Sequence, residues 1–351
     1  MKSERRIVFL YTELAGYILR CFERLSHVGV DVHVVAYPVN VEAPFQFNFA
    51  ASKCKFYDRS EHTFKTLEAL IRAVDPQAMV VSGWIDSTYV KLARTFKPSF
   101  RQTVLIDNPY ASNMKTNLSI LRARLLFKKA FHSAWVPGMP QVKFAKIMGF
   151  DPDKIYDGFY TADVVHLSAI NWESAEADFP KRFVFTGRYV DFKGIRELWE
   201  AFAKVDRCGW ELYCAGTGPL YEDRSFAEGI HHVGFVQPVD FGTFAQQGGV
   251  FILPSRREPW GVVVHEFAAV GYPLLCSAAV GSASAFLEEG ENGFTFKPNS
   301  VNSIRSVLER IIATPSEDLW EMGAKSRKLA AQVTVNDWVE TALELLKPRY
   351  A

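Results

Sequence analysis

Short apolar runs rich in β-branched residues alternate along the chain with longer segments whose apolar residues recur every three or four positions. Runs of the first kind predict strands, and spacing of the second kind predicts helices. In the first half, the predicted strands are residues 6–12, 30–38, 78–84 and 102–108. Helices are predicted between them at 16–29 and 63–75. This alternation is typical of a doubly wound α/β domain built on a parallel sheet.

The same alternation begins again in the second half. The strands predicted there are residues 183–189, 210–218, 230–236, 249–255, 273–277 and 293–298. Helical spacing appears at 194–205 and, near the end of the chain, at about 334–348. The mostly polar segment 168–182 is expected to be a linker between the two series.

We therefore expect two Rossmann-like domains, residues 1–165 and 166–333, with a boundary near 166–181. The chain has 351 residues, of which 48% are hydrophobic and 23% charged, which is enough to bury two full cores. Its five cysteines show no Cys-x-x-Cys or Cys/His spacing, so we expect reduced thiols and no structural zinc. No apolar run approaches the length needed to cross a bilayer, and the charged start resembles no signal peptide. These features predict a cytoplasmic protein.

Charge divides along the same boundary. Residues 1–165 contain 22 Lys and Arg against 15 Asp and Glu, a net charge of +7; the rest contain 18 against 24, a net charge of −6, which together give +1. The densest basic cluster is residues 118–135, where four cations alternate with leucines and phenylalanines: Arg122, Arg124, Lys128 and Lys129. A basic amphipathic helix can lie on an anionic membrane surface. The same pattern also fits a core helix with a solvated basic face.

Two glutamates in the second half, Glu258 and Glu266, have seven residues between them. This spacing alone is a weak signal, because Glu309 and Glu317 share it around an ordinary surface segment. The surroundings of the first pair are more informative. "VFILPS" predicts a strand, "RREPW" a loop, and "GVVVHEFAAVG" a helix that ends at its last glycine.

The predicted strand, loop and helix suggest which ligand the two glutamates could bind. The first amides of the helix, near Gly261 and Val262, together with the helix dipole favour a phosphate above the strand end. A carboxylate repels phosphate, but its two oxygens can accept hydrogen bonds from a vicinal diol. A phosphate flanked by two polyols describes a nucleotide sugar, with a hexose at one side and a ribose at the other.

Other residues of the second half could complete the same site. Arg188 follows a predicted strand and Lys193 lies five residues later, so one loop could hold both cations over a diphosphate and neutralise a departing nucleotide. Taken alone, either is also compatible with a surface charge. Gly216, in "CAGTGPL", could let the backbone approach a ligand or could serve only a tight turn, because the third glycine of a dinucleotide fingerprint is missing.

Four segments together resemble the donor-binding domain of retaining GT-B glycosyltransferases of family four. They are "FTGRYVDFKGIRELWEAF", "AGTGPL", "HHVGFV" and "LPSRREPWGVVVHEFAAVGYPLLCSAAVGSASAFLEEGENGFTFKP". They follow the order and intervals of that family over about residues 181–298. The resemblance implies two Rossmann-like domains facing a cleft, with the donor in the C-terminal domain and the acceptor mostly in the N-terminal one. It also implies that the last helix packs back on the first domain.

The resemblance assigns roles to the residues of the second half. Arg188 and Lys193 match the pair that binds the donor diphosphate. Glu258 matches the acid that contacts the transferred sugar, and Glu266 matches the one that holds the ribose hydroxyls. Backbone amides at Gly261 and Val262, which contact sugar and phosphate, complete the set.

In the first half the match is looser. Gly16 stands in the first strand-to-helix loop, where the family usually has a glycine-rich turn beside the donor phosphate; here there is one glycine. Asp107, in "LIDNPY", stands where many members have a histidine, and with Asn108 it is the candidate for orienting the sugar or the acceptor. Asp107 could equally cap a helix or a turn.

The implied reaction moves a hexosyl group from a nucleoside diphosphate sugar to an acceptor hydroxyl with retention of configuration. In such enzymes the leaving phosphate helps to deprotonate the acceptor, so we expect neither a metal nor another cofactor. The expected acceptor is a glycan or lipid-linked glycan in bacterial surface polysaccharide or glycolipid assembly, at the inner face of the membrane, and no nucleic acid partner is expected. The alternatives are another GT-B enzyme, such as a nucleotide sugar epimerase or a phosphorylase, and a non-catalytic subunit that binds a nucleotide sugar or a glycan.

Overall fold

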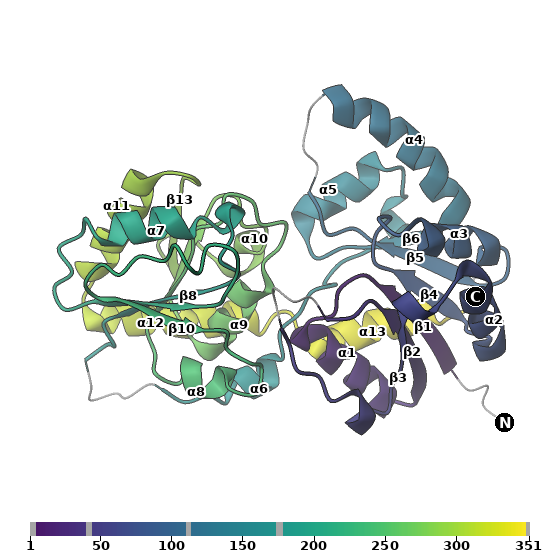
Figure 1. Ribbon diagram of the computed structural model, residues 1–351, viewed down its shortest axis with the longest axis horizontal. Helices are drawn as coiled ribbons and strands as arrows, with labels where there is room; N and C mark the ends of the chain where they lie inside the picture. Colours follow the sequence, from purple (N-terminus) through teal and green to yellow (C-terminus); the bar gives the residue numbers. More distant parts are fainter. Residues whose placement is uncertain (1–4, 40–43, 110–113, 173–177, 349–351) are drawn as a thin grey trace. The chain divides into compact units, whose positions relative to one another are not determined.

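A computed structural model describes residues 5–39, 44–109, 114–172 and 178–348. It contains two compact α/β units (Figure 1). Unit 1 consists of residues 1–40, 46–161 and 335–351, and unit 2 consists of residues 41–45 and 162–334. In the described residues, no helix combines the length and the apolar character needed to cross a membrane.

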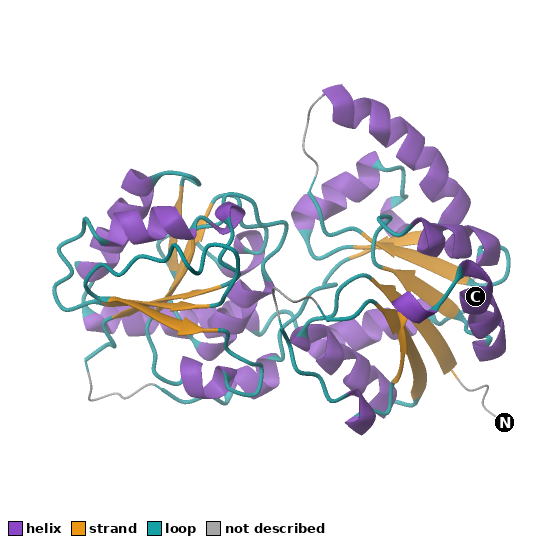
Figure 2. Ribbon diagram, in the orientation of Figure 1, coloured by secondary structure: helices purple, strands orange, loops and turns teal. Residues whose placement is uncertain are grey.

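Unit 1 is built on a sheet that has helices on both sides (Figure 2). The sheet has seven parallel strands in the order β3-β2-β1-β4-β5-β6-β7. The strands are β1 (Arg5–Tyr11), β2 (Val30–Ala36), β3 (Lys55–Asp58), β4 (Ala78–Val81), β5 (Arg101–Leu105), β6 (Ser133–Trp135) and β7 (Ile155–Tyr156). The helices are α1 (Gly16–His27), α2 (Phe64–Val74), α3 (Ser87–Phe96), α4 (Met114–Ala130), α5 (Met139–Ile147) and α13 (Val335–Leu345). Short 3-10 turns are η1 (Phe49–Ala51), η2 (Arg59–Glu61) and η3 (Pro152–Lys154).

The sheet of unit 1 is apolar on both faces, because each face is covered by helices. Side chains of α1 and α13 form one core with β1 and β2, and side chains of α2 to α5 form the other. The last helix contributes Trp338, whose ring centroid lies 4.9 Å from that of Trp135 and 5.8 Å from that of Phe9. A helix from the last part of the chain therefore completes the first unit.

Unit 2 repeats the plan with six parallel strands in the order β10-β9-β8-β11-β12-β13. The strands are β8 (Arg182–Thr186), β9 (Glu211–Ala215), β10 (Ile230–Gly234), β11 (Val250–Leu253), β12 (Leu274–Ser277) and β13 (Gly293–Phe296). The helices are α6 (Val164–Ser168), α7 (Ile195–Phe202), α8 (Phe241–Ala245), α9 (Val262–Val270), α10 (Ala283–Phe286), α11 (Val301–Ile312) and α12 (Ser316–Ala330), with the 3-10 turn η4 (Asp191–Lys193).

The region 118–135 differs from the single helix that we expected. Helix α4 ends at Ala130, and Ser133–Trp135 forms β6 in the interior of the sheet. The ammonium group of Lys97 donates to the carbonyl of Phe131 at 2.6 Å, where the helix gives way to the strand. The prediction was wrong here because a three-residue strand is too short to show its own periodicity.

The segment expected to be a linker is packed where it is described. The indole N–H of Trp172 donates to the carbonyl of Val270 at 2.8 Å, and Phe179 is buried against Trp320. Both belong to unit 2, whose longer segment begins at Ala162 and not within 166–181. Aromatic residues scattered among polar ones were sufficient to anchor the segment.

In each sheet the strand order reverses between the first strand and the fourth, that is, between β1 and β4 and between β8 and β11. The connections at these two points leave in opposite directions, so the carboxyl ends of the adjacent strands are left open to a ligand.

Candidate functional site

Three loops of unit 2 meet above the carboxyl ends of β8, β9 and β11. Glycines allow this approach. A Cβ atom on Gly194 would lie 2.2 Å from the carbonyl oxygen of Pro254, and one on Gly216 would lie 1.9 Å from that of Gly187. Both glycines also have positive φ, at 68° and 136°. The absence of a side chain at Gly216 thus allows the loop after β9 to contact the loop after β8, with or without a ligand.

Lys193 and Glu258 form an ion pair in this region. The ammonium group of Lys193, at the end of η4, donates to Oε2 of Glu258, which also accepts from the hydroxyl of Ser255 at 3.2 Å. The two side chains are only 14% and 11% exposed. The loop after β8 and the loop after β11 are therefore joined by opposite charges, as well as by close backbone contact.

Arg188 lies in the same β8 loop. It is half-buried, and its guanidinium carbon lies 5.8 Å from the centre of the Phe192 ring. The carbonyl of Phe192 in turn accepts a hydrogen bond from the backbone N–H of Arg256, at 2.7 Å. Two candidate cations, Arg188 and Lys193, thus lie on a loop that is tied to the segment leading into α9.

The amino end of α9 has no capping side chain. Gly261 precedes the helix with φ 89°, and its carbonyl accepts a hydrogen bond from the hydroxyl of Ser282 at 2.9 Å. A Cβ atom on Gly261 would lie 2.9 Å from Cγ of Glu258, so the glycine also makes room for that carboxylate. Among the residues that the structure describes, no side chain caps the first amides of this helix, and uncapped amides of this kind are typical of anion sites.

Glu266 lies one turn further along α9 and is partly exposed to solvent. The surrounding protein desolvates its carboxyl group and raises its pKa to about 7. In the part of the chain that the structure describes, it makes no hydrogen bond. A desolvated carboxylate without donors costs free energy, which hydroxyl groups of a ligand would offset.

The pair with the same spacing has ordinary surroundings. Glu309 is exposed and accepts from Nε of Arg305 at 2.7 Å. Glu317 is exposed in the first turn of α12, where a negative charge is stabilised by the helix dipole. The two pairs therefore differ in environment even though their spacing is the same.

Two candidates lie in unit 1, at the carboxyl ends of its strands. Gly16 is the first residue of α1, whose amino end has no side-chain cap. Asp107 follows β5, and burial raises the pKa of its carboxyl group against hydrogen bonds from Tyr160, Asn108 and its own backbone. Its Oδ2 accepts from the hydroxyl of Tyr160 at 3.4 Å, and its Oδ1 accepts from the amide of Asn108 at 2.8 Å. The backbone hydrogen bonds are those of a turn cap, so this alternative fits the geometry as well.

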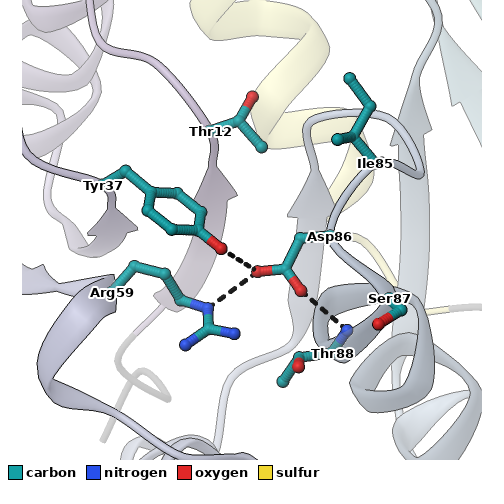
Figure 3. A pocket seen from close by; sticks show the side chains of 7 residues that line it. All are labelled: Thr12, Tyr37, Arg59, Ile85, Asp86, Ser87 and Thr88. Atoms are coloured by element: carbon teal, nitrogen blue, oxygen red, sulfur yellow. Dashed lines mark hydrogen bonds and ion pairs between the residues drawn. The ribbon is translucent and has the colours of Figure 1, made fainter. Parts of the chain in front are cut away.

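The sequence analysis missed a group of residues beside the switch point of unit 1. Tyr37, Arg59 and Asp86 come from three different loops and are joined by hydrogen bonds at one side of a cavity (Figure 3). The sequence contains only a weak indication of this group: Asp86 precedes Ser87, a pattern typical of a helix N-cap. In the described residues, no group of three or more His, Cys, Asp or Glu side chains could hold a metal ion.

Comparison with known families identifies the segment that carries the loops of unit 2. Residues 180–314 match the family model described as glycosyl transferases group 1. This part of unit 2 is therefore similar to the glycosyl transferases of group 1. The segment lies within unit 2 and includes every candidate residue placed there, from Arg188 to Glu266.

Curated relatives match this chain over part of their length. The chain is 30% identical over 144 residues to an uncharacterized glycosyltransferase of Methanocaldococcus jannaschii, covering 39% of this chain and 37% of the relative. It is 26% identical over 161 residues to the capsular polysaccharide biosynthesis glycosyltransferase CapM of Staphylococcus aureus, covering 42% of each. These matches span less than half of the relatives' own lengths.

Solved structures match nearly the whole chain. Sucrose-phosphate synthase from Thermosynechococcus elongatus superposes with a TM-score of 0.72 at 15% identity, covering 97% of this chain and 98% of that one. The Anabaena protein Alr3699/HepE, solved with UDP-glucose, superposes with a TM-score of 0.73 at 14% identity, covering 97% and 99%. At such identities the likeness concerns the fold, and it confirms the predicted α/β GT-B fold with two Rossmann-like domains.

Proposed function

We propose that this protein is a glycosyltransferase that moves a hexosyl group from a nucleoside diphosphate sugar to an acceptor hydroxyl, with retention of configuration. One observation carries the proposal. At the switch point of unit 2, an uncapped helix amino end lies between two carboxylates, Glu258 and Glu266, with Lys193 beside the first. This order matches the order of groups in a nucleotide sugar.

In this proposal the diphosphate lies at the amino end of α9, within reach of Arg188 and Lys193. Glu266 accepts from the ribose hydroxyls, and Glu258 accepts from hydroxyls of the transferred hexose. Lys193 is hydrogen-bonded to Glu258. The residue assigned to the β-phosphate and the residue assigned to the hexose therefore lie next to each other, as these two parts of the donor do. The cations and the helix end then hold the charge that develops on the leaving diphosphate.

The acceptor is assigned to unit 1, with Asp107 orienting the acceptor or the sugar and Gly16 allowing the α1 loop to approach the donor phosphate. The mechanism requires no metal, since the charge of the leaving group is held by side chains and amides. Relatives named for capsular polysaccharide and lipopolysaccharide core biosynthesis support a role in surface polysaccharide or glycolipid assembly. We further propose a cytoplasmic protein that binds the inner face of the membrane through α4.

The test is a screen of the full chain with UDP-, GDP- and ADP-sugars in the absence of acceptor, with release of the nucleoside diphosphate as the readout. We expect slow hydrolysis of the sugars of one nucleobase, and calorimetric binding of the matching free nucleoside diphosphate. An epimerase would change the sugar without releasing the nucleotide, and a phosphorylase would show the absorbance of a lysine-bound pyridoxal. Binding without any turnover would favour a non-catalytic subunit, and absence of both would overturn the proposal.

A further inference from the structure

Unit 1 contains a cavity of about 520 Å³ that the proposed donor site does not use. It lies at the carboxyl ends of β1, β2 and β4, beside η2 and the first turn of α3 (Figure 3). Its lining residues come from loops more than 70 residues apart in sequence, from Thr12 to Thr88. The size is that of a small-molecule pocket, and the position is the switch point of the sheet.

The charged groups of this cavity neutralise each other. Nε of Arg59 donates to Oδ2 of Asp86 at 2.8 Å, and the hydroxyl of Tyr37 donates to the same oxygen at 2.9 Å. The other oxygen, Oδ1, accepts from the backbone N–H of Thr88 at 2.7 Å. The side chains of Arg59 and Asp86 are only 13% and 6% exposed. Both carboxylate oxygens are thus occupied, and the ion pair leaves no net charge at the wall.

Several polar groups remain available to a ligand. Arg59 uses Nε and Nη1, the latter donating to the carbonyl of His62 at 2.7 Å, whereas its Nη2 has no hydrogen-bond partner in the described residues. The hydroxyl groups of Ser87 and Thr88 likewise have none there, and hydroxyls can both donate and accept. The cavity therefore offers three polar groups that are not used by the fold.

Apolar surface lies beside these groups. Ile85 is 88% exposed and Tyr37 is 38% exposed, and both line the cavity. An exposed isoleucine at the mouth of a polar cavity contributes nothing to the core. Together with the exposed part of the Tyr37 side chain, it suits the C–H face of a saturated ring.

This combination discriminates among ligands. A cation would meet a carboxylate whose oxygens are already occupied, and an anion would approach Asp86 while facing a guanidinium that is already neutralised. Hydroxyl groups on a saturated ring match the free donors and acceptors, and its C–H face matches Ile85 and Tyr37. A neutral sugar has both features.

We propose that this cavity binds a neutral sugar unit of the acceptor glycan. The assignment to the acceptor rests on the proposed function, because the donor is assigned to unit 2. The recognition of a neutral sugar rests on the cavity alone. Tyr37, Arg59, Ile85, Ser87 and Thr88 are then specificity-determining residues.

The test measures saturation-transfer NMR and affinity for the full chain with methyl glucoside, methyl mannoside and methyl galactoside, against glucuronate and glucosamine. We expect at least one neutral glycoside to bind, and the two charged sugars to bind about tenfold more weakly or not at all. Equal or tighter binding of a charged sugar would overturn the proposal, as would absence of binding by every neutral glycoside.

Two matched variants locate the binding. Ile85→Asp places a carboxylate at the cavity, whereas Val239→Asp makes the same change in unit 2 at a residue that is also 88% exposed. Exposed substitutions of this kind usually change the free energy of unfolding little, and melting curves check this. We expect Ile85→Asp to weaken binding of the neutral glycoside by about tenfold and Val239→Asp to leave it unchanged. If the two variants bind the glycoside equally, the sugar binds elsewhere and the proposal is wrong.

The outcomes also separate this proposal from the proposed function. Nucleoside diphosphate binding by the wild-type chain is measured in the same preparation. Neutral glycoside binding that is sensitive to Ile85→Asp, without any nucleotide binding, would overturn the donor site and leave the sugar cavity standing. Nucleotide binding without neutral glycoside binding would overturn the sugar cavity and leave the donor site standing.

Discussion

At the scale of single residues, Lys193 is the sharpest test of the donor site, since it is largely buried and paired with Glu258. If it holds the leaving diphosphate, Lys193→Ala should lower donor turnover by about a hundredfold, comparable to the loss of one preorganised donor. Lys204→Ala is the control, because the ion pair that Lys204 forms with Glu200 is exposed. Steady-state hydrolysis of the donor compares them, and near-normal turnover in Lys193→Ala would show that the leaving group binds elsewhere.

Glu266 gives a second comparison within the chain. If its carboxylate accepts from the ribose, Glu266→Ala should weaken binding of the free nucleoside diphosphate by about 1–3 kcal/mol. Glu317→Ala should leave the affinity unchanged, since Glu317 is an exposed residue in another helix. Calorimetry with the three proteins measures the difference. Equal affinities in all three would remove the ribose assignment.

The raised pKa of the Glu266 carboxyl group predicts that the stability of the fold depends on pH. Burial raises its pKa to about 7 in the folded chain, above the ordinary value of 4.5, so the folded state favours the protonated form. Its contribution to stability is therefore present below pH 4.5 and is lost as the pH rises towards 7 and above. Glu266→Gln should raise the free energy of unfolding at pH 8 by about 1–3 kcal/mol, and by much less at pH 5. Urea unfolding at the two pH values tests this, and an equal gain at both would contradict it.

Individual residues also show how far the sequence leads. The loop positions of Arg188, Lys193 and Glu258 followed from motifs, because a strand, a loop and a helix have fixed local order. The direct pairing of Lys193 with Glu258 did not follow, since it depends on two loops 65 residues apart in sequence. The cluster of Tyr37, Arg59 and Asp86 was missed for the same reason: its members come from separate loops.

At the scale of secondary structure, long periodic segments were predictable and very short strands were not. The helices at α1, α2 and α7 were expected from their spacing, and so were most of the buried strands. Strands β6 and β7 have three and two residues and were missed, because their pairing is imposed by the sheet and not by local preference.

Helix α9 contains a buried histidine that joins it to two other segments. Nδ1 of His265 accepts from the backbone N–H of Ala162 at 3.1 Å, and Nε2 lies 3.0 Å from the carbonyl of Ala330, to which it donates in the neutral ring. Burial lowers its pKa to about 4, although the hydrogen bond to Ala330 opposes this. The neutral ring thus links α9 to Ala162, which precedes α6, and to the last residue of α12.

This histidine should make unit 2 sensitive to acid. In the unfolded chain it takes up a proton near pH 6.5, whereas in the folded chain it does so only near pH 4. Stability is therefore complete above pH 6.5 and falls as the pH drops from 6.5 to 4, by about 3 kcal/mol in all. His265→Gln should be less stable at pH 7 but should lose less stability between pH 7 and pH 4.5. Urea unfolding gives both values, and identical pH slopes in the two proteins would contradict the assignment.

At the scale of the whole molecule, the division of charge draws attention to α4. Arg124, Lys128 and Lys129 are exposed, and next to them Leu125 and Leu126 are 60% and 37% exposed, whereas Phe127 is buried. Exposed leucines among cations favour the membrane alternative over the solvated one. The side chain of Arg122, the fourth basic residue expected in this cluster, lies outside the described residues.

We predict reversible binding of the protein to anionic membranes through this helix. Each cation near such a surface contributes about 1 kcal/mol, so changing Arg124, Lys128 and Lys129 to Gln should reduce partitioning roughly a hundredfold. The control changes Lys204, Lys297 and Arg305 of unit 2, which removes the same charge elsewhere and should leave partitioning nearly intact. Sedimentation with phosphatidylglycerol liposomes at low salt measures it, and added salt should release the wild-type protein because it screens the attraction. If the wild-type protein does not sediment at low salt, α4 presents only a solvated basic face.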